Sequence, residues 1–187
     1  MTEQNAAQTA QAGEKEILLE RLRQGRERYL RAFDIVSEGH ATWRHSDDRW
    51  SILECAEHVA VAEEQMLRLW EKLAVPGTTD RAKDEKLLAV AYDRTRTNQA
   101  PERSRPTGKC SSLEEALNRF NAARDRTLAF VAAVPVEELR TKIVQHPLAG
   151  ELDGFQLFTL MALHPERHGL QVQEVRYHPE FPGSSHP

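Results

Sequence analysis

Apolar residues recur every three or four positions along four stretches of the chain, at about residues 14–37, 51–73, 112–133 and 155–175. Because a helix turns by about 100° per residue, this spacing places them on one helical face. Four amphipathic helices of this length bury their apolar faces best against one another, so the pattern predicts an all-α four-helix bundle. The inner face of the first helix, for example, carries Leu18, Leu22, Gly25, Tyr29, Phe33 and Val36.

Polar residues mark where these helices begin. Ser51 and Glu54 form an S-x-x-E capping box, in which the serine side chain caps the free N–H groups and the glutamate reaches back to the cap. Ser112 and Glu115 repeat this pattern before the third helix. Asp153 or the residue after it leads into the fourth helix.

The connections between the helices differ in length. The first two helices are joined by a short loop, which favours antiparallel neighbours. Residues 78–110 form a long crossover between the second and third helices, which allows these two to run parallel. We expect a short helix within residues 84–92 of the crossover and a brief strand at residues 142–145.

With 187 residues, of which 40% are hydrophobic, the chain is long enough for one domain with a substantial core. Residues 1–13 are polar, and we expect a disordered lead-in there. The bundle domain is expected to span residues 14–178, followed by a mobile tail over residues 179–187.

Composition excludes several classes of partner. The formal charge of −4 gives no general attraction to nucleic acid or to an anionic membrane. The chain has neither a signal-peptide pattern nor an apolar run of the roughly 20 residues that a membrane span needs. Cys55 and Cys110 are too few for a disulfide scaffold, which favours a reducing compartment. We therefore expect a soluble cytoplasmic protein.

The crossover is locally basic. A solvated loop is the favoured interpretation, and the alternative is a rim that attracts an anion or an acidic substrate. Few aromatic residues accompany the charges, so an oligonucleotide track is poorly supported. The basic residues are Arg94, Arg96, Arg103, Arg105 and Lys109.

The best indication of function is a pair of histidines on the inner face of the fourth helix. His164 and His168 are four residues apart, which stacks two imidazoles one turn apart and lets both bind one metal ion. The same spacing also occurs in ordinary packed histidines, so a metal site needs a third ligand. His58 lies at the edge of the inner face of the second helix and can complete a site across the bundle.

Pro165 directly follows the first histidine of the pair. The H-E-x-x-H motif of zinc proteases has its glutamate base at this place, so that class of enzyme is poorly supported. The proline also removes a backbone donor inside the helix and is expected to bend it.

Three further residues are candidates for the site. Gln171 returns to the histidine face and can hydrogen-bond a ligand or a bound water, or simply pack. Glu54 is favoured as the capping partner over a general base. Cys55 is favoured as a small buried thiol over a metal ligand. His40 and His45 lie in a loop and are favoured as solvated residues over residues that touch a site. Three other histidines are expected not to be ligands: His146, His178 and His186.

Two motifs in this order resemble the DinB-like (YfiT-like) superfamily of four-helix-bundle metalloenzymes. They are Trp50-Ser51-x-x-Glu54-x-x-x-His58 and, more than a hundred residues later, His164-x-x-x-His168-x-x-Gln171. The sequence from Arg103 to Phe120 also resembles one branch of the superfamily. The likeness covers nearly all of residues 14–176.

The resemblance implies an up-down-down-up bundle with a long crossover between helices two and three, commonly paired into a homodimer. It also implies a divalent metal, zinc or nickel, bound by His58, His164 and His168. Three imidazoles leave one coordination position for water or substrate, which is the pattern of a catalytic zinc site. Characterised relatives transfer low-molecular-weight thiols onto electrophiles or isomerise through a thiol adduct, and others are described as hydrolases.

We therefore expect a metal-dependent enzyme that activates a low-molecular-weight thiol or water for attack on a small electrophile. Such an enzyme would be a thiol S-transferase or a hydrolase of a small-molecule substrate. Gln171 and Glu54 are its further catalytic candidates. The alternative is a non-catalytic metal-binding or stress-related interaction protein built on the same bundle.

Overall fold

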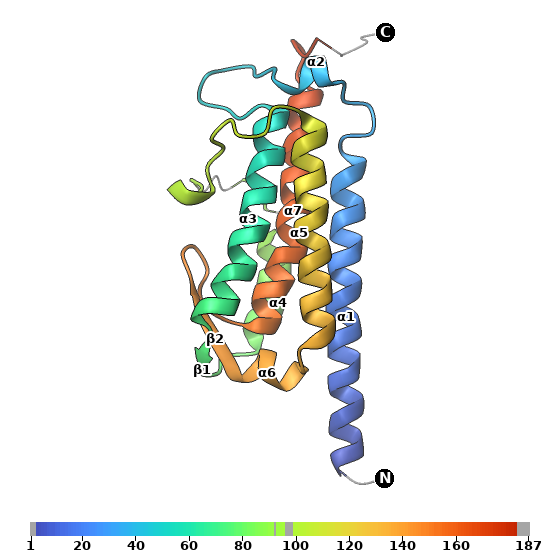
Figure 1. Ribbon diagram of the computed structural model, residues 1–187, viewed down its shortest axis with the longest axis vertical. Helices are drawn as coiled ribbons and strands as arrows, with labels where there is room; N and C mark the ends of the chain where they lie inside the picture. Colours follow the sequence, from blue (N-terminus) through green and yellow to red (C-terminus); the bar gives the residue numbers. More distant parts are fainter. Residues whose placement is uncertain (1–2, 92, 96–98, 183–187) are drawn as a thin grey trace.

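Four long helices dominate the computed structural model, which describes residues 3–91, 93–95 and 99–182 (Figure 1). They pack side by side, and most of the chain is helical, so the predicted four-helix bundle is confirmed. The helices are α1 (Glu3–Arg31), α3 (Ile52–Leu73), α5 (Leu113–Ala133) and α7 (Gly154–Arg176).

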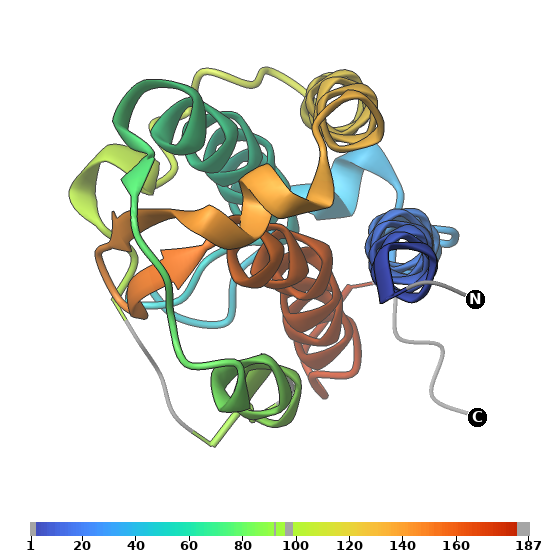
Figure 2. The same cartoon turned by 90° about the horizontal axis from the view of Figure 1, so that it is seen from below.

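The direction of the helices follows the expected up-down-down-up order (Figure 1). In that view α1 runs up, α3 and α5 run down, and α7 runs up again. Seen end-on in Figure 2, α7 lies between α1, α3 and α4 (Ala82–Ala91), and it contacts all three. Because α7 is surrounded in this way, its side chains can meet residues from several other elements.

Shorter elements connect the four long helices. The crossover holds α4 and a short 3₁₀ helix, η1 (Glu102–Ser104), while α2 (Glu38–Ala41) follows α1 and α6 (Val136–Thr141) follows α5. A small antiparallel sheet has the order β1 (Val75–Pro76), β2 (Lys142–His146) and β3 (Gly150–Asp153). The expected short helix and brief strand are therefore both present.

The core forms two apolar clusters along the bundle. One includes Leu22, Trp70 and Phe158, and the other includes Tyr29 and Phe120. Several polar side chains are buried as well, among them Glu57, His58, Glu63, Arg124 and His168, whose contacts are described below. Among the described residues, no helix combines the length and the apolar character that crossing a membrane requires.

The first helix differs from the expectation at both ends. It begins at Glu3, where we expected an irregular lead-in over residues 1–13, of which residues 1–2 lie outside the described part. Ala, Gln and Glu are strong helix formers, and extending an existing helix needs no new nucleus. The helix ends at Arg31, and residues 32–35 continue as turns held by i→i+3 hydrogen bonds.

The C-terminal segment is packed over part of the region expected to be mobile. Phe181 is only 8% exposed, and its ring meets those of His40 and Trp43 edge-on at centroid distances of 5.5 and 5.4 Å. Edge-to-face aromatic contacts of this kind stabilise a segment that has no regular structure of its own. Residues 183–187 lie outside the described part, and the domain division at residues 14–178 stays a prediction.

Capping residues act as predicted at the start of α3. The Ser51 side chain accepts from the Glu54 N–H, and Glu54 accepts from the Ser51 N–H. The second predicted box is only half formed, because Glu115 accepts from the backbone N–H and hydroxyl of the neighbouring Ser111 instead of the Ser112 N–H. A further box, between Asp153 and Gln156, begins α7.

Candidate metal centre

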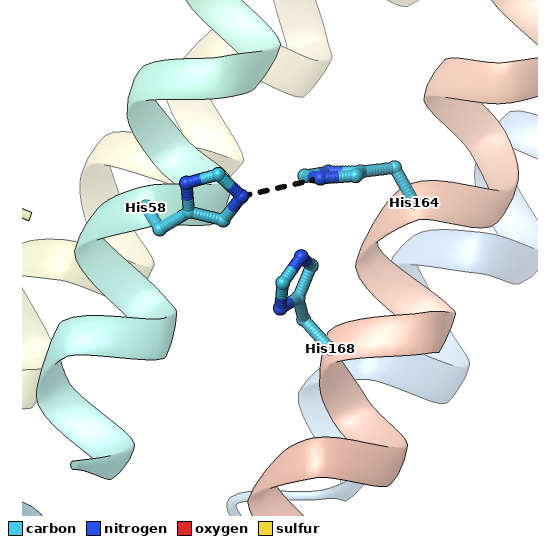
Figure 3. Close-up of side chains that lie close together, drawn as sticks. All are labelled: His58, His164 and His168. Carbon is cyan, nitrogen blue, oxygen red and sulfur yellow. Dashed lines mark hydrogen bonds between the residues drawn. The ribbon is translucent and has the colours of Figure 1, made fainter. Parts of the chain in front are cut away.

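Three histidines from two helices point toward one another in the middle of the bundle (Figure 3). His58 comes from α3, and His164 and His168 come from successive turns of α7. Their ring centroids are 4.6 to 5.1 Å apart, and one nitrogen from each ring lies within 4.8 Å of the others. The structure thus brings together the three histidines that the sequence singled out as ligands.

Hydrogen bonds determine which nitrogen each ring turns toward the centre. The Nδ1–H of His58 donates to the carbonyl oxygen of Ser104 at 2.6 Å, because a carbonyl can only accept. The Nδ1–H of His168 donates to the side-chain oxygen of Gln171 at 3.0 Å. In both rings Nε2 is therefore left with its lone pair, which is the form that binds a metal.

The spacing of one donor pair matches that of ligands on a single divalent ion. Two nitrogens bound tetrahedrally to one zinc ion at about 2.0–2.1 Å lie about 3.3–3.4 Å apart. The Nε2 atoms of His58 and His164 are 3.3 Å apart. Imidazole suits zinc and nickel alike, so the donor set fits either ion.

Burial keeps the three rings neutral. It lowers the pKa of His58, although the bond to Ser104 raises it in part. Burial lowers the pKa of His164 and that of His168 well below the ordinary value, and repulsion between the charged forms of the three rings lowers both further. A metal competes with protons for these nitrogens, so neutral rings are prepared for binding at neutral pH.

A tryptophan covers one side of the histidines. The Trp50 ring lies 4.8 Å from the His58 ring and 6.2 Å from the His168 ring, centroid to centroid. Its indole is half-buried and separates part of the site from bulk water. The sequence placed Trp50 in the motif of the resembled family, but its contact with the histidines is a finding of the structure.

A cavity of about 1120 Å³ opens beside the three histidines. It extends between α3, the crossover loop, the β2–β3 turn and α7. Leu69 of α3, Leu148 of the turn and Leu160 of α7 contribute apolar surface, and Gln171 lies in the wall near the histidines. A small molecule in this cavity would reach the unprotonated nitrogens.

Glu57 anchors the crossover loop next to the site. Its carboxylate is 1% exposed and accepts four hydrogen bonds, from the Thr107 N–H and hydroxyl and from the N–H groups of Gly108 and Lys109. Burial raises the pKa of Glu57, but these bonds lower it more, to below the ordinary value. The anchored loop supplies the Ser104 carbonyl that orients His58.

Sequence reasoning missed Glu57, although its neighbours gave a signal. It directly precedes His58 and follows Ala56 on a helix whose small residues pack closely. A carboxylate among such residues is rarely left without partners. The pattern could have flagged the residue, but not the loop that binds it.

A second missed group lies below the histidines. Arg124 of α5 is fully buried and donates to both carboxylate oxygens of Glu63 in α3, at 2.8 and 2.9 Å. It also donates to the carbonyl oxygens of Leu22 in α1 and Met161 in α7, both at 2.7 Å. One guanidinium thus links all four long helices, and the charged pair is fully hydrogen-bonded as burial requires.

The contacts of Glu54 support the capping role. Its two oxygens accept from the Ser51 N–H at 2.8 Å and from the Arg44 guanidinium at 3.1 Å, and Glu54 is not among the residues that line the cavity. A catalytic role for Glu54 stays a prediction.

Burial raises the pKa of the Cys55 thiol, which keeps it protonated and a poor ligand.

The other histidines lie apart from the three-histidine cluster. His146 lines the cavity at the β2–β3 turn. His45 and His178 stack on each other, with ring centroids 4.7 Å apart, and His40 packs on Phe181. Across the described part of the chain, no other group of histidine, cysteine or carboxylate residues is arranged to hold a metal. His186 lies outside that part.

Comparisons with known proteins identify the family of the chain. Residues 21–172 match the DinB superfamily. No curated protein matches the chain.

Solved structures share the fold at low identity. YfiT from Bacillus subtilis, described as a probable metal-dependent hydrolase with an unusual four-helix bundle topology, is 15% identical with a TM-score of 0.58, over 87% of this chain and 85% of that one. TT2238, a four-helix bundle protein, is 21% identical with a TM-score of 0.55, over 86% and 98% of the two chains. An uncharacterised protein from Clostridium difficile 630 is 14% identical with a TM-score of 0.56, over 86% and 94%.

Proposed function

Because this chain belongs to the DinB superfamily, we propose that it is a metal-dependent enzyme acting on a small molecule. The observation that carries the proposal is the convergence of His58, His164 and His168 beside an open cavity. These three residues would hold zinc or nickel. A divalent metal there supplies a nucleophile near neutral pH, because it lowers the pKa of a bound water or thiol.

The residues around the histidines have distinct tasks in this proposal. The Ser104 carbonyl and the Gln171 side chain hold the Nδ1–H groups of His58 and His168, and so keep both rings in the binding tautomer. Trp50 shields one side of the site from water. The same indole forms part of the wall of the cavity through which the electrophile would enter.

Two reaction classes are compatible with this arrangement. Hydrolysis is supported by the description of YfiT as a probable metal-dependent hydrolase. Transfer of a low-molecular-weight thiol is supported by the resemblance of the motifs and by the cavity volume of about 1120 Å³, which leaves room for a thiol beside an electrophile. We further propose a cytoplasmic homodimer, and the two free cysteines fit a reducing compartment.

Metal analysis tests the first part of the proposal. Wild-type protein loaded with zinc or nickel should retain one ion per chain, and His58→Ala should lose it. His45→Ala is the matched control, because that histidine is exposed and lies outside the cluster. Wild-type protein that binds no stoichiometric metal would contradict the proposal.

Activity measurements test the second part. Thiol cosubstrates are combined with electrophiles in one set of assays, and esters and amides are supplied in another. Turnover by wild type and by His45→Ala, but not by His58→Ala, supports the enzyme. Equal rates in wild type and His58→Ala would remove the catalytic claim, and stoichiometric metal without turnover would favour the non-catalytic alternative.

A further inference from the structure

The cavity beside the histidines is lined by cationic side chains, although the whole chain has more acidic than basic residues. The chain contains 29 Asp and Glu against 25 Lys and Arg. Among the lining residues the balance is reversed, with only Asp48 and Asp93 acidic. Besides Arg94, which is paired with Glu174, the basic lining residues are Arg49, Arg68, Lys72, Arg103, Arg105 and Arg167.

Two of these arginines are placed at defined positions of the wall. Arg68 lies on α3, one turn after Gln65, whose side-chain amide donates to the Arg103 carbonyl oxygen. This bond holds the Arg103 backbone beside the same face of α3. Neither the Arg68 nor the Arg103 guanidinium donates a hydrogen bond or forms an ion pair within residues 3–91, 93–95 and 99–182.

Most other arginines near the bundle are used differently. Arg119, Arg124 and Arg140 each form an ion pair with a carboxylate. Guanidinium groups that line a cavity without such a pair keep their donors for a ligand, and their planar fork matches carboxylate and phosphate groups. The chemistry of Arg68 and Arg103 therefore points to an anion.

His146 adds a neutral donor to the same wall. Its Nδ1 accepts from the N–H groups of Leu148 and Ala149 at 3.3 and 3.1 Å, so the proton of the neutral ring is on Nε2. Burial lowers the pKa of His146, and the nearby charge of Arg103 lowers it further. Both residues line the cavity, and the Nε2–H of His146 is left for a ligand.

An apolar strip lies between Arg68 and the three histidines along α3. Ala62, Met66 and Leu69 follow His58 along one face of α3, and Leu160 faces them from α7. At about 1.5 Å of rise per residue, Arg68 lies about 15 Å along the helix from His58. Both side chains lean toward the helix N-terminus, but the arginine is longer and reaches further in that direction, which shortens the gap that a ligand must span.

We propose that the cavity takes a small organic anion with an apolar body, its anionic group held by Arg68, Arg103 and His146 and its body directed along Met66 toward the histidines. This inference rests on the proposed function, because it assigns the substrate class of that enzyme. A carboxylate and a phosphate ester share the required chemistry, and the experiment distinguishes them.

Binding of matched probes tests the anion site. Octanoate, octyl phosphate and the neutral octanamide are titrated calorimetrically into zinc-loaded wild type. Octanoate or octyl phosphate should bind about tenfold or more tightly than octanamide, as expected for one charge-assisted interaction. The tighter of the two identifies the preferred anionic group. Equal affinity of all three probes would overturn the proposal.

Two double variants locate the preference. Arg68→Gln/Arg103→Gln should bind the anions no better than octanamide. Arg23→Gln/Arg126→Gln changes the net charge equally, at exposed positions outside the cavity lining, and should behave as wild type. Circular dichroism checks that both variants are folded. An anion preference that survives in the first variant would overturn the assignment.

A third variant separates anion binding from the metal. His58→Ala removes one proposed ligand but leaves the basic wall intact, so its preference for octanoate over octanamide should persist. Loss of the preference in His58→Ala, with retention in Arg68→Gln/Arg103→Gln, would show that the anion binds the metal and would refute the inference. If wild type binds no zinc, the proposed function fails, whereas the Arg68 and Arg103 comparison still measures the anion site.

Discussion

Arg124 donates to the carbonyl oxygen of Met161 at 2.7 Å, and this oxygen is the one that Pro165 leaves without a helical partner. In an α-helix the carbonyl of residue i accepts from the N–H of residue i+4, and proline has no N–H. The guanidinium of α5 takes over that bond in the turn that carries His164. The proline between the two α7 histidines is thus supported from another helix.

Replacing Arg124 should therefore be strongly destabilising. Arg124→Met removes the cation that pairs with the buried Glu63 carboxylate, which keeps only the hydrogen bond from the Thr127 hydroxyl, and it removes a donor from two helix carbonyls. The free energy of unfolding should therefore fall by about 3–5 kcal/mol. Urea denaturation measures the change. Arg126→Met, at a side chain that is 58% exposed, is the control and should stay within about 0.5 kcal/mol of wild type. Similar losses in the two variants would contradict the role of Arg124.

Gly25 should not tolerate a methyl group. A Cβ at this position would lie 2.1 Å from the carbonyl oxygen of Ala162, so α1 and α7 would have to separate. We expect Gly25→Ala to cost about 1–3 kcal/mol. Gly13→Ala, in the same helix with nothing within 4 Å, should instead stabilise by about 0.5–1 kcal/mol. Denaturation midpoints that move in the same direction would argue against this close helix contact.

Gln171 should affect metal affinity without being a ligand. Gln171→Leu removes the acceptor that orients His168, and affinity for zinc should fall about 10–100-fold. Competition with a zinc-binding dye measures the affinity. Gln173→Leu, at an exposed position on the same helix, should leave it unchanged. A Gln171 variant with wild-type affinity would reduce the residue to a packing role.

The metal-free protein should lose stability in mild acid. Burial lowers the pKa values of His58, His164 and His168 in the folded protein. In the unfolded chain the pKa of a histidine is about 6.5. Below that pH the unfolded chain binds more protons, so the free energy of unfolding should decrease as pH falls. Urea denaturation of the metal-free protein at about pH 7.5 and at about pH 5.5 measures this decrease. The decrease should be smaller in His168→Gln, and an unchanged decrease there would contradict the assignment.

Glu57 should couple the crossover to the metal site. Glu57→Gln weakens four hydrogen bonds to residues 107–109, at an expected cost of about 1–3 kcal/mol. Because the same loop supplies the Ser104 carbonyl, zinc affinity should fall as well. The exposed Glu71→Gln on the same helix is the control. A loss of stability without any change in zinc affinity would separate the loop from the site.

The bundle and the three histidines were predictable because both follow from short-range patterns. Ser51, Ser112 and Asp153 each cap the helix they precede, so the starts of α3, α5 and α7 agree with the sequence. Helical spacing placed His164 and His168 on the inner face. Facing helices in a bundle then brought His58 within reach of them.

The boundaries of α1 were not predictable from the same pattern. Its start carries no capping signal, and its polar residues resemble a disordered segment in composition although they favour helix. Its apolar spacing continues beyond Arg31 through Phe33, which is buried from a turn rather than from the helix. The apolar periodicity indicates which residues are buried, and here the buried residues continue past the end of the helix.

The partners of the site were hidden for a different reason. The Ser104 carbonyl is a backbone group, so its role cannot be recognised from the residue type. The partners of Glu57 are 50 or more positions away, and those of Arg124 are 37 to 102 positions away. Such pairings depend on how the loop and helices pack. A pattern along the chain cannot specify them.

His58 and His164 are 106 positions apart in the chain, yet their Nε2 atoms are 3.3 Å apart. An ion shared by these rings would act as a cross-link that closes most of the polypeptide into a loop, and constraining a loop of this length restricts the unfolded ensemble. The stability of the bundle against unfolding would then depend on how much of the ion is available. A chelator would act on this protein as a mild denaturant.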